Sequence, residues 1–570
     1  MKNKEISALF EKMADLMEFK GENPFKVSAY RRAARIIGDL TRDIEEIFRG
    51  GELKAIPGVG EGIAQKISEY LETGRMAAYD ELHEGIPEEL LALMNIPGMG
   101  PKTLSLIHKE VGIKDMADLR RALEDGRIIG LPGMGEKKVE NIRRGIELLA
   151  QSRGRMSLGL AFPLATRVVE SMKRATGLTK IEVAGSLRRM REDIGDIDIL
   201  ATGSEGKKII AAFTGLPEVR EVIASGDTKG SVVVEGGTQI DLRAVEEESY
   251  GAALQYFTGS KPHNIHLRSI ARAQDLKINE YGIFKNDKRI GGREEYEVYT
   301  ALGMIWIPPE LREDRGEIEA AQRGELPNLL EKSDVKGDLH VHSNWSDGSS
   351  DLDEIARWGK SMGYQYVAIC DHSKSLKIAR GLAEDRLLRQ MDEIDRINEH
   401  LDGFRLLKGT EVDILTDGTL DLSDEVLSRL DIVIAAIHTG FKQPREKITR
   451  RILLAMQNPH VDIIAHPTGR LLGSREPYEV DLDPVMEMAV QTHTGLEINA
   501  YHERLELTDI QCMRAKGKGV MIAIGTDAHH PEQMWMMSLG VAVARRGWLE
   551  KDDVLNCLPA HRLIQWCKKA

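Results

Sequence analysis

Strand-like apolar segments alternate with amphipathic helical segments from about residue 336 to residue 570, and this alternation limits the possible fold more than any other feature. The strand-like segments include YVAICD, FRLLKGTEV, IVIAAIHT, VDIIAHP, GLEINA and VMIAIGTD. Such alternation predicts parallel βα units, and the number of repeats favours a barrel. Because barrel active sites lie at the carboxyl ends of strands, the polar residues that follow these segments are candidates for a site.

Histidine and carboxylate residues occupy those strand ends. His340 and His342 are two residues apart on a strand-like segment, which places both side chains on one face of it. With them we group Asp347, His372, Glu411, His438, His466, Asp527 and His529. A single histidine of this kind is usually structural, but these nine residues together suffice for more than one divalent ion. Lys408 and Arg470 are candidates for binding substrate phosphates.

A second carboxylate cluster is predicted in the middle of the chain, where short β-branched runs from about residue 160 to 315 indicate an α+β domain with antiparallel pairing. Asp196 and Asp198 share one face of a strand, and Asp241 on another strand would complete a site for Mg²⁺ or Mn²⁺. A DxD pair alone is commonly a surface loop. Here it follows a turn suited to a triphosphate, formed by Gly185, Ser186, Arg188 and Arg189.

Residues 1 to about 155 predict helices that are separated by glycine-rich turns. Three related phrases recur there, AIPGVGEGIAQKI, NIPGMGPKTLSLI and GLPGMGEKKVENI. Each turn leaves N–H groups at a helix start free to bind a phosphate, and although one copy would more often be a simple helix cap, three copies favour DNA binding. The candidate contacts are Gly58, Gly60, Gly98, Gly100, Gly133 and Gly135.

Composition excludes membrane and disulfide-rich classes. The net charge of −13 argues against a protein that coats nucleic acid non-specifically, although basic stretches at 26–35 and 143–155 allow local contacts. No apolar run approaches the roughly 20 residues of a membrane span, and the N-terminus predicts an amphipathic helix instead of a signal peptide. The expected lack of a signal peptide favours a cytoplasmic protein, and the four cysteines form no CxxC pair, which favours reduced thiols.

The order of these motifs resembles the bacterial and archaeal family X DNA polymerases that carry a C-terminal polymerase and histidinol phosphatase (PHP) domain. Besides the motifs above, the resemblance rests on YFTGSKPHNIHLR and INEYGIF, and it covers nearly the whole chain. It implies a helical lyase-like domain at 1–90, helix-hairpin-helix fingers at 91–155, a nucleotidyltransferase palm at 156–250, a thumb at 251–315 and a distorted (β/α)7 PHP barrel at 336–570. The polar, proline-punctuated residues 316–335 are expected to be a linker.

The resemblance also implies roles for single residues in the thumb. Tyr256 and Phe257 would line the sugar pocket of the incoming nucleotide, and Asn264 would reach its minor-groove edge. Gly259 would belong to the turn that follows, and Arg268 would contact the template. Lys261 departs from polymerase beta, which has an acidic residue at this position, and is expected to add a phosphate or base contact.

In the first domain the resemblance implies a second type of chemistry. Lys66 would match the lysine that attacks the sugar aldehyde of an abasic site, with Lys26 and Tyr30 at DNA-contact positions. That reaction requires a neutral amine. An exposed helix lysine without such a role is the alternative for Lys66.

The sequence therefore predicts a DNA-directed DNA polymerase that fills short gaps in DNA repair, with a 3′-5′ exonuclease in the PHP domain. An abasic-site endonuclease, a 3′-phosphatase and a 5′-deoxyribose phosphate lyase are further candidate activities. The expected cofactors are Mg²⁺ or Mn²⁺ at the polymerase site and three ions of Zn²⁺, Mn²⁺ or Fe²⁺ at the PHP site. The expected partners are gapped or primer-template DNA and dNTPs, with the protein acting as a monomer. The alternatives are a nuclease or phosphoesterase whose polymerase-like half only binds DNA, and a repair scaffold without enzymatic activity.

Overall fold

The computed structural model describes residues 2–38, 44–56, 59–96, 99–136, 138–143, 146, 155–203, 205–234 and 237–569. The chain forms two compact units, one of residues 1–153 and one that begins at residue 154. The predicted DNA contacts Gly58 and Gly98 lie outside the described residues. Within the described ranges, none of the helices has the length and apolar character needed to cross a bilayer.

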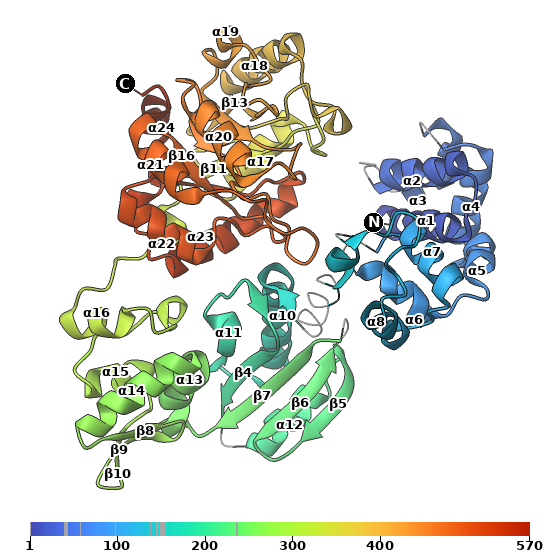
Figure 1. Ribbon diagram of the computed structural model, residues 1–570. Helices are drawn as coiled ribbons and strands as arrows, with labels where there is room; N and C mark the ends of the chain where they lie inside the picture. Colours follow the sequence, from blue (N-terminus) through green and yellow to red (C-terminus); the bar gives the residue numbers. More distant parts are fainter. Residues whose placement is uncertain are drawn as a thin grey trace. The chain divides into compact units, whose positions relative to one another are not determined.

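The first unit is built from helices, as predicted (Figure 1). They are α1 (Asn3–Lys20), α2 (Pro24–Gly38), α3 (Ile44–Arg49), α4 (Glu61–Thr73), α5 (Ala77–His83), α6 (Glu88–Leu91), α7 (Pro101–Val111) and α8 (Met116–Glu124). One buried cluster includes Phe10 of α1 and Ile67 of α4. A second includes Leu104 of α7 and Leu119 of α8. The two clusters show that this unit contains two small helical cores.

The palm consists of a five-stranded sheet with helices (Figure 1). Its elements are α10 (Leu158–Thr176), β2 (Ile181–Val183), α11 (Gly185–Arg188), β4 (Ile197–Thr202), α12 (Gly206–Thr214), β5 (Val219–Ser225), β6 (Lys229–Val234) and β7 (Gln239–Val245), with a small pair of β1 (Met156–Ser157) and β3 (Asp193–Ile194). The strand order is β2-β4-β7-β6-β5. The predicted antiparallel pairing holds except between β4 and β7, which are parallel and place Asp198 opposite Asp241. This exception follows from the intervening α12 and the β5–β6 pair, after which the chain returns beside β4.

The segment predicted as the thumb packs together with a helix that follows it. Together they contain α13 (Tyr250–Thr258), α14 (Lys261–Ala273), β8 (Lys277–Asn279), β9 (Gly282–Lys285), β10 (Lys288–Gly291), α15 (Glu295–Ala301) and α16 (Glu317–Arg323). The expected linker at 316–335 includes α16, whose Ile318 and Ala321 are buried in the thumb core. Glu317 is also buried, and its carboxylate lies 2.6 Å from Nδ1 of His263. One of the acidic residues of this segment is therefore a paired, buried charge, although others, such as Glu325, are exposed.

Seven parallel strands in sequence order form the barrel, which confirms the predicted fold (Figure 1). The strands are β11 (Gly337–Val341), β12 (Tyr366–Ile369), β13 (Arg405–Asp413), β14 (Ile432–Ala436), β15 (Ile463–Ile464), β16 (Gly495–Asn499) and β17 (Ile522–Gly525). The helices are α17 (Leu352–Ser361), α18 (Glu384–Asn398), α19 (Asp424–Leu427), α20 (Arg445–Met456), α21 (Leu482–Thr492), α22 (Asp509–Lys518), α23 (Met537–Arg546) and α24 (Ala560–Cys567). A bridge between Val341 and Ala528 brings the first strand beside the segment after the last, so the barrel is nearly closed.

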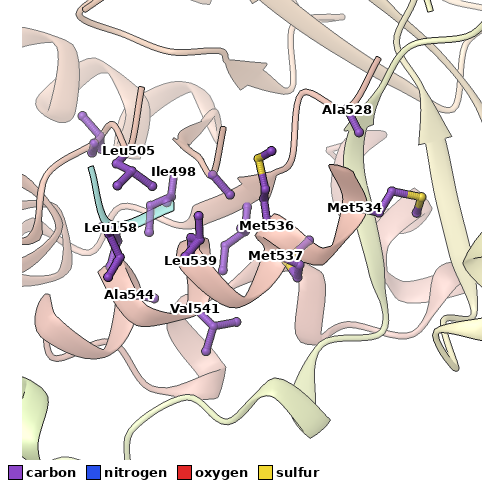
Figure 2. Close-up of a cluster of buried hydrophobic side chains, with 14 of the residues drawn as sticks. Leu158, Ile498, Leu505, Ala528, Met534, Met536, Met537, Leu539, Val541 and Ala544 are labelled. Carbon is purple, nitrogen blue, oxygen red and sulfur yellow. The ribbon is translucent and has the colours of Figure 1, made fainter. Parts of the chain in front are cut away.

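The palm packs directly against the barrel within the second unit. Figure 2 shows Leu158, the first residue of α10, in a buried cluster with side chains of the barrel such as Ile498 and Leu539. A Cβ added to Gly159 would lie 2.2 Å from Cβ of His502, so only glycine permits this approach. An ion pair accompanies the apolar contact, since Arg470 lies 2.6 Å from Glu192 of the palm. The contact gives the palm and the barrel a shared core.

Glu295 is a buried anion that joins the palm to the thumb. Its carboxylate accepts hydrogen bonds from Arg188 at 2.6 and 3.0 Å and from Arg312 at 2.6 Å. Burial opposes its ionisation, but Arg312 and Arg188 outweigh that effect and lower the pKa of Glu295 to about 2.

We predict that Glu295→Ala lowers the free energy of unfolding by about 3–5 kcal/mol, because it leaves the fully buried Arg312 without its anion. Urea denaturation of the full chain measures the change. Glu319→Ala is the matched control, since the Glu319 side chain is 49% exposed and lies 4.0 Å from His266. Equal stability losses in the two variants would show that the buried pair contributes little.

Candidate functional site

The three predicted carboxylates of the palm come together at the start of two neighbouring parallel strands. Asp198 on β4 lies in register with Asp241 on β7, and Asp196 directly precedes β4. Burial, followed by the charges of Asp196 and Asp241, raises the pKa of Asp198 to about 6. A divalent cation bound between these three carboxylates would offset their mutual repulsion.

Two residues that the sequence analysis did not identify hold Asp241. Nζ of Lys229 lies 2.8 Å from Oδ2, and the Gln239 amide donates to Oδ1 at 2.8 Å. Burial opposes ionisation of Asp241, but these contacts outweigh it and lower the pKa of that carboxyl. Lys229 faces Asp241 from the adjacent strand β6, a long-range pairing that local sequence spacing does not reveal.

In addition to its predicted role in nucleotide binding, Gly185 makes room for the Asp198 carboxylate. Its φ is +61°, and an added Cβ would lie 2.3 Å from Oδ2 of Asp198. A side chain at this position would therefore displace the carboxylate. Ser186 follows in the short helix α11, so the predicted triphosphate turn lies beside the carboxylates.

The two arginines of that turn contact the thumb. Arg188 forms the bidentate pair with Glu295, and Arg189 lies 3.0 Å from Glu313 and donates to the Thr258 carbonyl at 2.8 Å. Both guanidinium groups are mostly buried. A triphosphate would have to compete with these carboxylates, so the contribution of each arginine to nucleotide binding stays a prediction.

The predicted nucleotide pocket lies at the junction of α13 and α14. Tyr256 and Phe257 contact each other edge to face with ring centroids 5.2 Å apart, and the Arg243 guanidinium lies 4.7 Å from the Phe257 ring centre. The Asn264 amide donates to the Tyr256 carbonyl at 2.7 Å and to the Gly259 carbonyl at 3.0 Å. Asn264 therefore fixes the turn between the two helices.

Two cations of α14 complete the predicted pocket. Lys261 is exposed at the start of α14, and Arg268 is exposed one to two turns later, where its Nε donates to the carbonyl of Asn264 at 3.2 Å. Both are accessible to a ligand.

The predicted lyase residues are neighbours in the first unit. Nζ of Lys66 lies 6.0 Å from the ring centre of Tyr30 and donates to the Gly62 carbonyl at 3.1 Å. Tyr30 itself is buried and packs against Phe10, with ring centroids 5.7 Å apart. Lys26 is half-exposed and lies 3.3 Å from Glu22. Lys66 and Lys26 are thus the accessible members of this group.

The described glycines of the three helix-hairpin turns are open to a ligand. Gly60 and Gly100 directly precede α4 and α7, and Gly133 has a φ of +75°. A Cβ added to any of these three, or to Gly135, would meet no atom within 4 Å. The positive φ of Gly133 by itself favours glycine, whereas no packing contact requires glycine at Gly60, Gly100 or Gly135, where contact with a DNA phosphate stays a prediction.

The predicted barrel ligands converge in three overlapping groups. They are His342, Asp347, His372 and His529; His340, His342 and Asp527; and His372, Glu411 and His438. Within each group, ligand atoms lie within 4.8 Å of one another. Nε2 of His340 and Nε2 of His342 are 3.2 Å apart, and Nε2 of His342 is 3.1 Å from Oδ1 of Asp527. Convergence of ring nitrogens and carboxylate oxygens on common points is the geometry of a multinuclear metal centre.

His466 borders the same cluster. Its Nε2 lies 2.8 Å from Oε1 of Glu411, which is also 3.3 Å from Nε2 of His438. Glu411 thus stands between several imidazoles and is nearly fully buried. All nine predicted residues are therefore within reach of one site.

Buried carboxylates behind the ligands were missed by the sequence analysis. Glu497 lies 2.7 Å from Nδ1 of His340, and Asp413 lies 2.7 Å from Nδ1 of His438. Such contacts fix the ring orientation and leave Nε2 free to bind a metal. Both acids stand near the ends of strand-like segments, GLEINA and TEVDI, so the rule that found the ligands also points to them.

The donor set fits zinc, manganese or iron. Nδ1 of His342 and Nδ1 of His466 are buried and have no hydrogen-bond partner among the described residues. Burial, with His529 and His372 nearby, lowers the pKa of His342 to about 4. Burial also disfavours protonation of His372, but Glu411 and Asp347 outweigh it and raise the pKa of His372 to about 10. A lowered pKa at His342 beside a raised pKa at His372 is expected where carboxylates and imidazoles crowd together in a metal-binding site.

The predicted phosphate-binding cations of the barrel have protein partners. Lys408 lies 2.9 Å from Asp395 of α18. Arg470 contacts Glu192 and donates to the Arg504 carbonyl at 2.8 Å. Arg470 therefore lies at the contact between the palm and the barrel.

Four segments of the chain match known protein families. Residues 1–76 match a helix-hairpin-helix domain, and residues 88–147 match a SAM-like helix-hairpin-helix tandem. Residues 253–313 match the DNA polymerase beta thumb, and residues 338–501 match the PHP domain. These matches confirm the predicted helical region, thumb and PHP barrel.

One relative aligns with nearly the full chain. The sequence is 42% identical over 560 residues to the DNA polymerase/3′-5′ exonuclease PolX of Bacillus subtilis (strain 168), covering 98% of this chain and 97% of the relative. Other relatives align with a smaller part. A probable phosphatase of Thermoanaerobacter sp. (strain X514) is 31% identical over 38% of this chain and 89% of the relative. A probable phosphatase of Syntrophotalea carbinolica is 34% identical over 38% of this chain and 90% of the relative.

We predict that metal binding to the barrel site releases protons. With a pKa of about 10, His372 is protonated at pH 7 in the metal-free protein and must lose that proton to bind a cation. The apparent affinity for Zn²⁺ or Mn²⁺ therefore rises with pH between 6 and about 10.

Calorimetric titrations of the metal-free protein with metal, in buffers of different ionisation enthalpy, measure the number of protons released for each ion that binds. The His372→Gln variant should release fewer protons on metal binding than the unaltered protein. The His561→Gln variant, which changes an exposed position of α24, should release the same number as the unaltered protein. An affinity independent of pH over this range would contradict the prediction.

Proposed function

The chain belongs to the family of the DNA polymerase/3′-5′ exonuclease PolX, and on this premise we propose that it fills short gaps in DNA and trims 3′ ends at separate metal sites. The register of Asp198 with Asp241, beside Asp196, is the observation that carries the polymerase assignment. The convergence of the barrel ligands supports the exonuclease. Metal dependence follows from both clusters, with Mg²⁺ or Mn²⁺ proposed for the palm.

At the palm site, the carboxylates position the reacting groups. Divalent ions held there would stabilise the attacking and leaving oxygens of nucleotidyl transfer. Asp241 is anionic at neutral pH and is placed to activate the primer 3′-hydroxyl. Ser186 and the N–H groups of α11 lie beside the carboxylates, where the triphosphate of a dNTP would bind.

At the barrel site, the chain supplies imidazoles of fixed orientation around a phosphodiester. Zn²⁺, Mn²⁺ or Fe²⁺, with three ions proposed, would activate water and neutralise charge on the phosphate. Glu497 and Asp413 hold His340 and His438 in place. The proposed substrate is the 3′ end of a DNA strand.

A phosphatase or abasic-site endonuclease activity at the barrel site is a second candidate. It is favoured by the probable phosphatases, which align over 38% of the chain and 89 or 90% of their own lengths. A terminal phosphate and a phosphodiester require the same attack at phosphorus, so one set of ligands suits both.

The alternative, a polymerase-like half that only binds DNA, would not require three carboxylates at one point. Asp198 with a pKa of about 6 is costly without a cation to relieve its burial and repulsion. We therefore favour catalysis on gapped or primer-template DNA with dNTPs, by a monomer in the cytoplasm.

We predict that Asp198→Ala lowers gapped-primer extension by about a hundredfold or more, because it removes a metal ligand, while 3′ degradation persists. His342→Ala should have the opposite effect. Denaturing gels of a labelled primer, with and without dNTPs, separate the two activities. The exposed residues Asp227 and His561 provide matched alanine controls. Loss of both activities in both variants, with folding intact, would contradict independent sites.

We also propose that Lys66 is a lyase nucleophile. Its neutral amine would attack the sugar aldehyde of an abasic site, water would leave, and borohydride would reduce the resulting imine to a stable cross-link. We predict that Lys66→Ala loses most of the cross-link to abasic DNA, whereas Lys12→Ala, at an exposed position of α1, retains it. A trapped product of equal yield in Lys66→Ala would assign the chemistry to another amine.

A further inference from the structure

The loop of residues 374–380, between His372 and α18, has an unusual surface. Lys374, Lys377, Ile378 and Arg380 are all exposed, and the segment SKSLKIAR contains no acidic residue. Ile378 is 73% exposed, the highest value for a large hydrophobic side chain among the described residues of the second unit. One exposed apolar side chain is ordinary on a protein surface. Here it stands among three exposed cations, on a loop that begins next to the barrel residue His372.

Both ends of this loop are fixed to the backbone of a barrel ligand. The Leu382 N–H donates to the His372 carbonyl at 2.7 Å, and the Ser373 N–H donates to the Glu411 carbonyl at 3.1 Å. A Cβ added to Gly381 would lie 1.9 Å from the Ser373 carbonyl oxygen, so the returning chain touches the outgoing chain. The loop therefore begins and ends at the metal-binding side of the barrel.

Side chains from the same region hold the loop in position. The Ser375 N–H donates to Asp421 at 2.6 Å, and the Ser375 hydroxyl donates to Asp413, which lies 2.7 Å from Nδ1 of His438. Arg386 donates to the Arg380 carbonyl at 2.8 Å. The exposed side chains are thus presented by a well-supported backbone.

Chain length limits how far Ile378 can be from the site. Gly381 is three positions further along the chain, and at about 3.6 Å per position the Ile378 Cα lies within about 11 Å of the Gly381 Cα. Along one strand of a duplex, this distance corresponds to about three nucleotides. Ile378 is therefore within reach of the terminal base pairs of a DNA whose 3′ end occupies the metal site.

The three cations are available for phosphate contacts. Among the described residues, no carboxylate forms an ion pair with Lys374, Lys377 or Arg380, whereas the nearby Arg389 lies 2.9 Å from Asp385. In a protein with a net charge of −13, such a segment is a local site for a polyanion.

We propose that this loop separates the strands of a duplex end next to the exonuclease site. Ile378 inserts between bases as a wedge, and Lys374, Lys377 and Arg380 bind phosphates of the DNA. The proposal rests on the exonuclease function and adds to it, because it explains how a paired 3′ end reaches a buried metal cluster.

A fluorescence experiment tests the wedge without requiring catalysis. A matched duplex with 2-aminopurine at the 3′ end is bound by the full chain in the presence of a chelator, which prevents cleavage. The unaltered protein should increase the fluorescence as the base unstacks, and Ile378→Ala at saturation should not. Val490→Ala, which changes a side chain 46% exposed on α21, should behave as the unaltered protein. An equal increase with Ile378→Ala would overturn the wedge.

A second test of the wedge compares the rates at which duplex and single-stranded DNA are degraded. In Ile378→Ala, the ratio of duplex to single-strand degradation should fall about tenfold, since unpairing would no longer be assisted. Equal losses on both substrates would contradict the proposal. An unaltered protein that degrades neither substrate would overturn the proposed function, while the fluorescence result would still decide the role of Ile378.

The phosphate contacts are tested by the salt dependence of DNA binding. Replacing Lys374, Lys377 and Arg380 with alanine should reduce the slope of log K against log salt by about 2 for a single strand. Replacing Arg357, Arg389 and Arg396 of α17 and α18 removes the same charge from exposed helix positions and should change the slope less. Equal changes in the two triple variants would show that the loop has no specific role.

Discussion

Carboxylates and imidazoles that are buried side by side repel or perturb one another, and this electrostatic cost is the constraint around which the second unit is organised. In the palm, the parallel pairing of β4 with β7 places Asp198 beside Asp241. In the barrel, parallel strands bring the nine predicted ligands from distant segments to one end. Parallel pairing requires long connections between strands, so each site depends on the complete fold around it.

The sequence predicted the architecture where local patterns determine it. The helical first unit and a parallel barrel follow from apolar periodicity, whereas the thumb and the seven-fold repeat of the barrel were implied by the family resemblance; all are confirmed. Residues 316–335 were predicted to be a linker; they include α16, where Glu317 looks solvated in sequence but pairs with His263 in the core. The parallel β4–β7 pair was missed for a related reason, since strand order depends on contacts between distant segments.

Residue types at strand ends predicted which side chains gather at the sites, but not their partners. Lys229 beside Asp241 and Glu497 beside His340 come from strands far apart in sequence. Arg470 was expected to bind phosphate, and the structure places it against Glu192 of the palm. Charged residues near an active site can therefore join domains as well as bind substrate, and sequence alone does not distinguish the two roles.

The central claim is that both clusters hold divalent cations. Anomalous diffraction from crystals soaked in Mn²⁺ tests it most directly. We expect peaks beside Asp196, Asp198 and Asp241, and a group of peaks among the barrel residues His340, His342, Glu411 and Asp527. Well-ordered side chains at both clusters, with no anomalous peak at either one, would contradict the account.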